Sequence, residues 1–212
     1  MRRVVKVGGS LLTSPTLVED LRRWTALQSP ARTYFVPGGG ALVDAIAEQQ
    51  GRLKFDDVAA HWLCIRAMQI HYEMLAALMP ECERVAVFNG TASDDSAFGA
   101  RASESADVGG GASWLDPWAL MQHDLRSAET KLGLKPLPAD WSVSSDSIAA
   151  RAASYLGAEE LVLLKSTLAD GDQPDYVDGY FAVAARDIPR VRFVNLRDPQ
   201  FAERRASTTW PS

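Results

Sequence analysis

Two short apolar segments, each ending in glycines, constrain the fold of this chain most strongly. Val4–Val7 runs into Gly8, Gly9 and Ser10, and Arg32–Val36 runs into Pro37 and a run of three glycines. Apolar residues at helical spacing follow each loop. Strand, loop and helix in this alternation predict a parallel sheet with right-handed crossovers. Both loops should then lie at the carboxyl edge of the sheet, where open α/β folds bind ligands.

The first loop has the composition of a phosphate-binding site. Lys6 lies inside the strand, and Gly8 and Gly9 allow a close approach to the backbone. Ser10 is a residue type that caps helices, whose free N–H groups attract anions. The same residues also make an ordinary turn, so the first loop alone does not decide between the two.

Further apolar patterns predict the remaining elements. Helices are expected over residues 16–25, 41–49, 56–79, 117–121, 145–156 and 181–185, and strands over residues 85–88, 161–166 and 191–195. A short strand or a turn is expected at residues 114–116. Residues 91–112 are rich in small and polar residues and read as a loop or a lid. The segment beyond Pro199 is polar and is expected to fray.

Composition limits the class of protein. A net charge of −5 over 212 residues argues against a nucleic-acid scaffold and against binding to an anionic membrane surface. Only Cys64 and Cys82 occur, so a disulfide framework is not expected. With no signal-peptide pattern and no long apolar run, the chain is expected to be cytoplasmic.

A second informative stretch runs from Asp140 to Lys165. Ser144 or Ser145 is expected to cap a helix with Asp146 in its first turn, where the helix dipole favours a negative charge. An apolar strand follows and ends in Lys165, which needs an anion or a carboxylate to offset its desolvation. His61 and His71, ten residues apart on one predicted helix, fit no metal pair and are assigned packing or surface roles.

Together these motifs resemble the amino acid kinase superfamily, which includes acetylglutamate, uridylate, aspartate and isopentenyl phosphate kinases. The resemblance is carried by three segments in the family's order, at residues 5–10, 36–40 and 145–150. It implies a three-layer αβα sandwich on an open, mainly parallel sheet. It also implies one domain over residues 1–205, with an acceptor-binding half to about 135, a nucleotide-binding half after it, and a polar tail at 206–212.

The resemblance implies an ATP- and Mg²⁺-dependent phosphotransferase. Catalysis would fall to Lys6, Asp146 and Lys165, with Asp146 orienting Lys6 or reaching the metal. Phosphates or nucleotide would meet Gly8, Gly9, Ser10, Lys165, Ser166, Asp170 and Gly171. The acceptor would meet Gly38, Gly39, Gly40, Asp44, Asp140, Trp141 and Ser144. Such chemistry needs positioning and charge stabilisation more than covalent catalysis.

One departure from the family leaves catalysis open. No lysine follows Lys165, so either Lys165 or an arginine such as Arg186 supplies the second cation on the ATP side, or transfer is lost. The alternative to a kinase is therefore a non-catalytic nucleotide- or anion-binding or storage protein on the same fold.

The run from Asp140 to Ala150 and the Lys165-Ser166 strand end are most similar to a small branch associated with methanofuran and methylofuran biosynthesis. That branch implies a phosphate or carboxylate acceptor, such as an aminomethylfuran methyl phosphate. Asp44 and Asp140 are candidates for binding an ammonium group, and Trp141 for stacking on a ring. The family commonly forms dimers, and the broad apolar stripe of residues 56–79 is compatible with either a homodimer interface or core.

Overall fold

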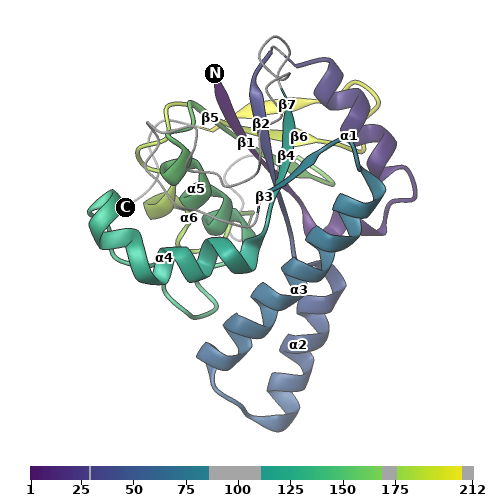
Figure 1. Cartoon of the computed structure of the whole chain (residues 1–212). Coiled ribbons are helices and arrows are strands. Elements are labelled where there is room, and N and C mark those ends of the chain that lie inside the picture. The colour runs from purple at the N-terminus through teal and green to yellow at the C-terminus, as the bar shows by residue number, and fades with distance from the viewer. Residues whose placement is uncertain (29, 86–110, 169–175, 207–212) are drawn as a thin grey trace.

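The computed structural model describes residues 1–28, 30–85, 111–168 and 176–206. Seven strands in this part of the chain form one sheet in the order β3-β4-β2-β1-β5-β6-β7 (Figure 1). The first six strands run parallel, and β7 pairs antiparallel with β6. The strands are β1 (Arg2–Val7), β2 (Arg32–Pro37), β3 (Glu83–Val85), β4 (Ala112–Leu115), β5 (Glu160–Lys165), β6 (Val191–Asn195) and β7 (Glu203–Arg205).

Helices cover both faces of the sheet, which confirms the predicted three-layer αβα sandwich. One face packs against α1 and the C-terminal half of α3, and the other packs against α4, α5 and α6. The helices are η1 (Gly9–Thr13, a 3-10 helix), α1 (Leu17–Ala26), α2 (Gly40–Leu53), α3 (Asp57–Leu78), α4 (Pro117–Leu132), α5 (Ser145–Leu156) and α6 (Phe181–Ala184).

Successive side chains of β1 point to opposite faces of the sheet, and this alternation decides which of them face α5. Val5 and Val7 point into the core beneath α1 and α3, whereas Val4 belongs to the core beneath α5. Lys6 is two residues from Val4 and therefore lies on the α5 face. On β5 the residues of that face include Leu161 and Leu163, so Lys165 shares it.

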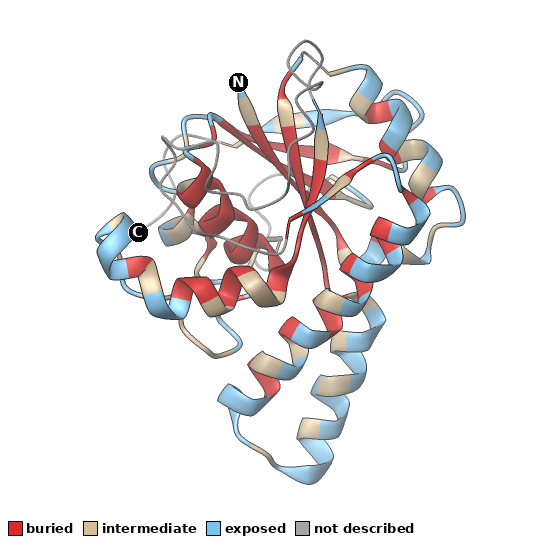
Figure 2. Cartoon of the chain, in the orientation of Figure 1, coloured by how far each residue is buried: buried red, intermediate tan, exposed pale blue. Residues whose placement is uncertain are grey.

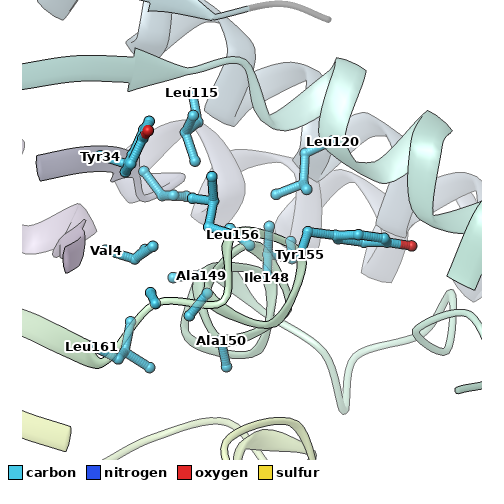
Figure 3. Packing of buried hydrophobic residues seen from close by; sticks show 14 of the residues in the cluster. Val4, Tyr34, Leu115, Leu120, Ile148, Ala149, Ala150, Tyr155, Leu156 and Leu161 are labelled. Carbon is cyan, nitrogen blue, oxygen red and sulfur yellow. The ribbon is translucent and has the colours of Figure 1, made fainter. Parts of the chain in front are cut away.

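Helix α5 packs closely on this face because its inner side carries small residues. Figure 3 shows Ile148, Ala149 and Ala150 against Val4 and Leu161 of the neighbouring strands. All twelve residues of α5 except Ser154 are buried, and α5 is the most uniformly buried helix in Figure 2. The start of α5 is thus held firmly above the carboxyl ends of β1 and β5.

The α2–α3 hairpin projects away from the sheet (Figures 1 and 2). Helix α2 buries none of its residues, so the apolar face expected for residues 41–49 does not enter the core. The C-terminal end of α3 is anchored against the sheet, where Tyr72, Leu75 and the C-cap residue Met79 are buried. The side chain of Asp56 caps α3 by accepting a hydrogen bond from the Ala59 amide at 2.7 Å.

Two predictions about local structure are wrong. The segment beyond Pro199 was expected to fray, but β7 pairs with β6 and Phe201 is buried. An ion pair between Arg192 and Glu203 joins the two strands, which a reading of polarity alone misses. Ser10 does not cap a helix: it lies inside η1, whose N-cap residue is Gly8 and has no side chain to accept a hydrogen bond.

Most of the other predicted helices and strands are confirmed to within a few residues, but α4 continues from the predicted residues 117–121 to Leu132. Pro117 lies in the first turn of α4, as predicted. Residues 86–88 of the third predicted strand lie outside the described residues, and so do residues 91–110 of the predicted loop or lid.

Candidate active site

The two glycine loops meet at the carboxyl edge of the sheet, as predicted. The Gly8 amide donates a hydrogen bond to Leu164 O at 2.9 Å, and the Gly38 amide donates one to Val7 O at 2.8 Å. A Cβ atom on Gly9 would lie 2.5 Å from the Gly40 nitrogen. Side chains at this contact would force the loops apart, and Gly40 also has a positive φ of 51°. Glycine is therefore required for the close approach of the loops.

Behind the loops, one carboxylate binds two lysines. Lys6 Nζ lies 2.8 Å from Asp146 Oδ1, and Lys165 Nζ lies 2.8 Å from Asp146 Oδ2. Lys165 also donates a hydrogen bond to the Tyr176 carbonyl at 2.8 Å. Lys6 and Asp146 are buried, and Lys165 is mostly buried. The three catalytic residues predicted from sequence are thus in direct contact, and their formal charges sum to +1.

Burial and the neighbouring charges both shift the pKa values of Asp146 and Lys165. Burial disfavours ionisation of Asp146, but the positive charges of Lys6 and Lys165 outweigh it and hold the pKa of the carboxyl below its usual value. Burial lowers the pKa of Lys165, and the neighbouring charge of Lys6 lowers it further against the opposing effect of Asp146. Lys165 therefore releases a proton more readily than a free lysine.

Asp178 organises the start of α5. Its Oδ2 accepts hydrogen bonds from the Ser144 amide at 2.9 Å, the Ser144 hydroxyl at 2.7 Å and the Ser147 amide at 2.9 Å. Its Oδ1 accepts one from the Ser147 hydroxyl. Ser144 is the N-cap residue of α5. Asp178 thereby stabilises the turn that carries Asp146, a role that no local sequence pattern indicates.

A cavity of about 500 Å³ opens between the glycine loops, α3 and the start of α5. Eight of the predicted site residues line it: Gly9, Ser10, Gly39, Gly40, Asp44, Asp140, Trp141 and Ser144. Lys6, Asp146 and Lys165 are not lining residues, but Ser145, adjacent to Asp146, is. The residues predicted to bind an acceptor thus gather around one volume next to the lysine–aspartate group.

Much of the lining is apolar, and two carboxylates are set into it. Asp44 lies on α2, and Asp140 lies on the loop before α5, where hydrogen bonds from the Ser142 hydroxyl and amide lower the pKa of its carboxyl. The Trp141 indole donates a hydrogen bond to Gln50 Oε1 on α2 at 2.8 Å. This wall therefore offers negative charge and an aromatic ring.

His61 also lines the cavity, although the sequence pattern assigned it a packing or surface role. The side chain is 5% exposed, and its Nε2 atom has no hydrogen-bond partner among the described residues. Burial lowers the pKa of His61, against the raising effect of the Asp140 carbonyl and carboxylate. A buried ring nitrogen without a partner is costly, so His61 is a candidate ligand contact on the cavity wall. The second histidine, His71, has a structural role, since its Nδ1 lies 3.0 Å from the Gly38 carbonyl.

The predicted nucleotide-side residues are only partly described. Ser10 and Ser166 meet, with the Ser10 hydroxyl donating to Ser166 Oγ at 3.0 Å. Asp170 and Gly171 lie outside the described residues. Arg186, the arginine considered as a second cation, is exposed and pairs with its neighbour Asp187 rather than lining the cavity.

Neither a metal cluster nor a membrane span is evident in the described chain. No group of three or more acidic, histidine or cysteine side chains could hold a metal ion in the described part. None of the described helices is both long and apolar enough to cross a bilayer.

No protein-family model matches the chain, and no curated protein matches it in sequence. Solved structures do match. UMP kinase from Bacillus anthracis has a TM-score of 0.59 at 14% identity, covering 93% of this chain and 88% of that one. Uridylate kinase from Archaeoglobus fulgidus has a TM-score of 0.54 at 12% identity, with coverages of 90% and 89%. UMP kinase from Ureaplasma parvum has a TM-score of 0.54 at 13% identity, with coverages of 95% and 92%. The chain has the amino acid kinase fold.

The amino acid kinase fold accounts for the geometry of the site. Parallel strands β1 and β5 are adjacent in the sheet, so their carboxyl ends bring Lys6 and Lys165 together. The crossover helix that precedes β5 starts above the same edge and supplies Asp146. The fold thus joins Lys6 to two residues that lie 140 and 159 positions further along the chain.

Proposed function

We propose that this protein is an ATP-dependent small-molecule kinase. The observation that carries the proposal is the contact of Lys6 and Lys165 with Asp146 beside two glycine loops and a cavity. Phosphoryl transfer is catalysed mainly by positioned positive charge and backbone amides, and this edge of the sheet offers both. In this proposal the two lysines stabilise the charge that develops on the transferred group, and Asp146 orients them.

Magnesium enters this proposal as part of the Mg-ATP substrate. Both oxygens of Asp146 already contact lysines, and the described chain offers no acidic cluster for a resident ion. The donor set therefore does not fit a resident Mg²⁺ on Asp146. Bound to nucleotide phosphates, Mg²⁺ would offset part of their charge. An enzyme that consumes ATP in this way would work in the cytoplasm.

The acceptor is expected to combine an anionic group, an apolar or ring-shaped body and an ammonium group. Val43, Ile65 and Met68 offer apolar contacts in the cavity, and Asp44 and Asp140 offer negative charge. An aminomethylfuran methyl phosphate has these features, and it is the acceptor of the branch that the sequence resembles. The cavity is lined from both predicted halves, so in this proposal the acceptor binds between the acceptor half and the nucleotide half.

The test is phosphoryl transfer from Mg-[γ-³²P]ATP to a panel of acceptors. The panel contains aminomethylfuran methyl phosphate, UMP and a simple carboxylate such as glutamate. Labelled product from the furan compound supports the full proposal, and product from another acceptor supports a kinase of different specificity. ATP binding without transfer to any acceptor supports the alternative, a non-catalytic nucleotide- or anion-binding protein. The absence of a lysine after Lys165 favours that alternative.

We further propose a homodimer through the α2–α3 hairpin. Several large apolar side chains of α3 are exposed, namely Val58, Leu63, Ile70, Met74 and Leu78, and they are joined by Leu42 and Leu53 of α2. An apolar surface of this kind is typical of subunit contacts. Sedimentation velocity distinguishes a monomer from a dimer, and Ile70→Glu should dissociate the dimer while leaving the fold intact.

A further inference from the structure

Arg197 is a cationic side chain at the cavity that is separate from the group formed by Lys6, Lys165 and Asp146. Among the described residues that line the cavity, it is the only lysine or arginine. Lys6 and Lys165 share one carboxylate and lie outside that lining. Arg197 is thus the cationic side chain that the lining of the cavity itself contains.

The backbone around Arg197 is anchored to the site. Arg197 follows β6, whose neighbour in the sheet is β5. The Leu196 amide donates a hydrogen bond to the Lys165 carbonyl at 3.0 Å, and the Arg197 amide donates one to Asn195 Oδ1 at 3.0 Å. The buried side chain of Leu196 adds a hydrophobic anchor. This segment is thus tied directly to the strand that carries Lys165.

The guanidinium reaches across to the first glycine loop. Its Nη2 atom donates hydrogen bonds to the Ser10 carbonyl at 2.9 Å and to the Thr13 hydroxyl at 3.3 Å. Both acceptors are neutral, and Arg197 forms no ion pair in the described part of the chain. The charge is therefore not offset by a carboxylate, and Nε and Nη1 are left for a ligand. Gly9, Ser10 and Thr13 line the cavity together with Arg197.

We propose that Arg197 binds a phosphate group in the cavity between the two glycine loops. A guanidinium held by neutral acceptors is suited to charge-assisted, bidentate contact with phosphate oxygens. The phosphate has two sources, the γ-phosphate of ATP or a phosphate carried by the acceptor. This inference rests on the proposed function, because it names a residue of the same site.

The experiment compares Arg197→Gln with the wild-type protein and with Arg186→Gln as a matched control. Arg186 is exposed, pairs with Asp187 and does not line the cavity. Binding of Mg-ATP, Mg-ADP, inorganic phosphate and UMP is measured by calorimetry, and the melting temperature is measured for each variant. Loss of a charge-assisted contact weakens binding roughly tenfold to a hundredfold, and Arg197→Lys should recover part of the affinity.

The pattern of losses identifies the source of the phosphate. If ATP binds more weakly to Arg197→Gln while ADP is unaffected, Arg197 contacts the γ-phosphate. If both nucleotides are unaffected while inorganic phosphate or UMP binds more weakly, it contacts the acceptor phosphate. Unchanged binding of all four compounds overturns the inference, and so does an equal loss for ATP and ADP that merely accompanies a lower melting temperature. A wild-type protein that binds none of them contradicts the proposed function as well.

Discussion

Replacing Asp146 with asparagine removes the carboxylate that pairs with both Lys6 and Lys165. Each lysine nitrogen lies 2.8 Å from a carboxylate oxygen, and the relative exposures of Lys6, Asp146 and Lys165 are 6%, 5% and 14% for the side chains. At an effective dielectric constant of about 20, each contact corresponds to about 6 kcal/mol of Coulomb attraction, before the cost of desolvation. The asparagine keeps the shape of the side chain but leaves two buried cations next to each other.

We expect Asp146→Asn to lower the free energy of unfolding by about 3 to 5 kcal/mol at pH 7, the usual cost of removing one partner of a buried ion pair. The loss should shrink as the pH rises. Burial and Lys6 already lower the pKa of Lys165; without Asp146 it falls further, so the unfolded chain binds more protons than the folded one. The free energy of unfolding of the variant therefore increases as the pH rises towards 10.5, the pKa of a lysine in the unfolded chain.

The stability of the wild-type protein should also depend on pH in the acid range, through Asp146. The pKa of Asp146 is lower in the folded protein than its usual value of 3.8. Its contribution to stability is therefore present above pH 3.8 and is lost as the pH falls through the lower folded value. Asp146→Asn should lack this part of the acid transition.

Urea unfolding followed by circular dichroism at pH 3, 5, 7 and 9 measures the free energy of unfolding of the wild type and of Asp146→Asn. The double variant Asp146→Asn/Lys165→Met is the internal control, because removing one of the two unpaired cations should recover part of the lost stability. An Asp146→Asn protein within about 1 kcal/mol of the wild type at pH 7, with no dependence on the second substitution, would refute the electrostatic account of this group.

Three further substitutions test separate parts of the site. Gly9→Ala should lower the free energy of unfolding by about 1 to 3 kcal/mol, because its Cβ would meet the Gly40 backbone. Gly51→Ala is the control, since a Cβ there meets nothing within 4 Å and should not lower it. Urea unfolding compares the two variants. Asp178→Asn should cost about 1 to 2 kcal/mol by weakening the start of α5; thermal melts that match the wild type would contradict this. His61→Phe should keep or raise the melting temperature because it removes a buried unpaired nitrogen, yet raise the KM for the acceptor severalfold with that for ATP unchanged.

The fold was predictable because its signals are local. The apolar runs of β1 and β2, the glycines that follow them and the periodic spacing of α3 are each contained within short windows of sequence. That Lys165 shares the carboxylate of Asp146 was not predicted. The family resemblance implied that Asp146 orients Lys6, and parallel strands place the carboxyl ends that carry the two lysines together. The alternation of side chains along β1 and β5 then decides which face they share.

The parts that sequence reasoning missed depend on distant contacts. Arg197 meets Ser10, which is 187 positions away, and no local pattern indicates this. His61 looks like any residue of an amphipathic helix until α3 is seen to line the cavity. Strand β7 is short and polar, and its pairing depends on the edge that β6 presents. Only the assembled fold brings these residues to their partners.

The most direct test of the account is single-turnover transfer from Mg-[γ-³²P]ATP by Lys6→Met, compared with Lys131→Met, an exposed lysine on α4. The assay uses the acceptor that the wild-type protein phosphorylates, and ATP binding is measured in parallel. The account predicts that Lys6→Met remains folded and loses at least about a hundredfold in rate, while Lys131→Met behaves as the wild type. Equal rates for the two variants would contradict the assignment of Lys6 and Asp146 to a phosphoryl-transfer site.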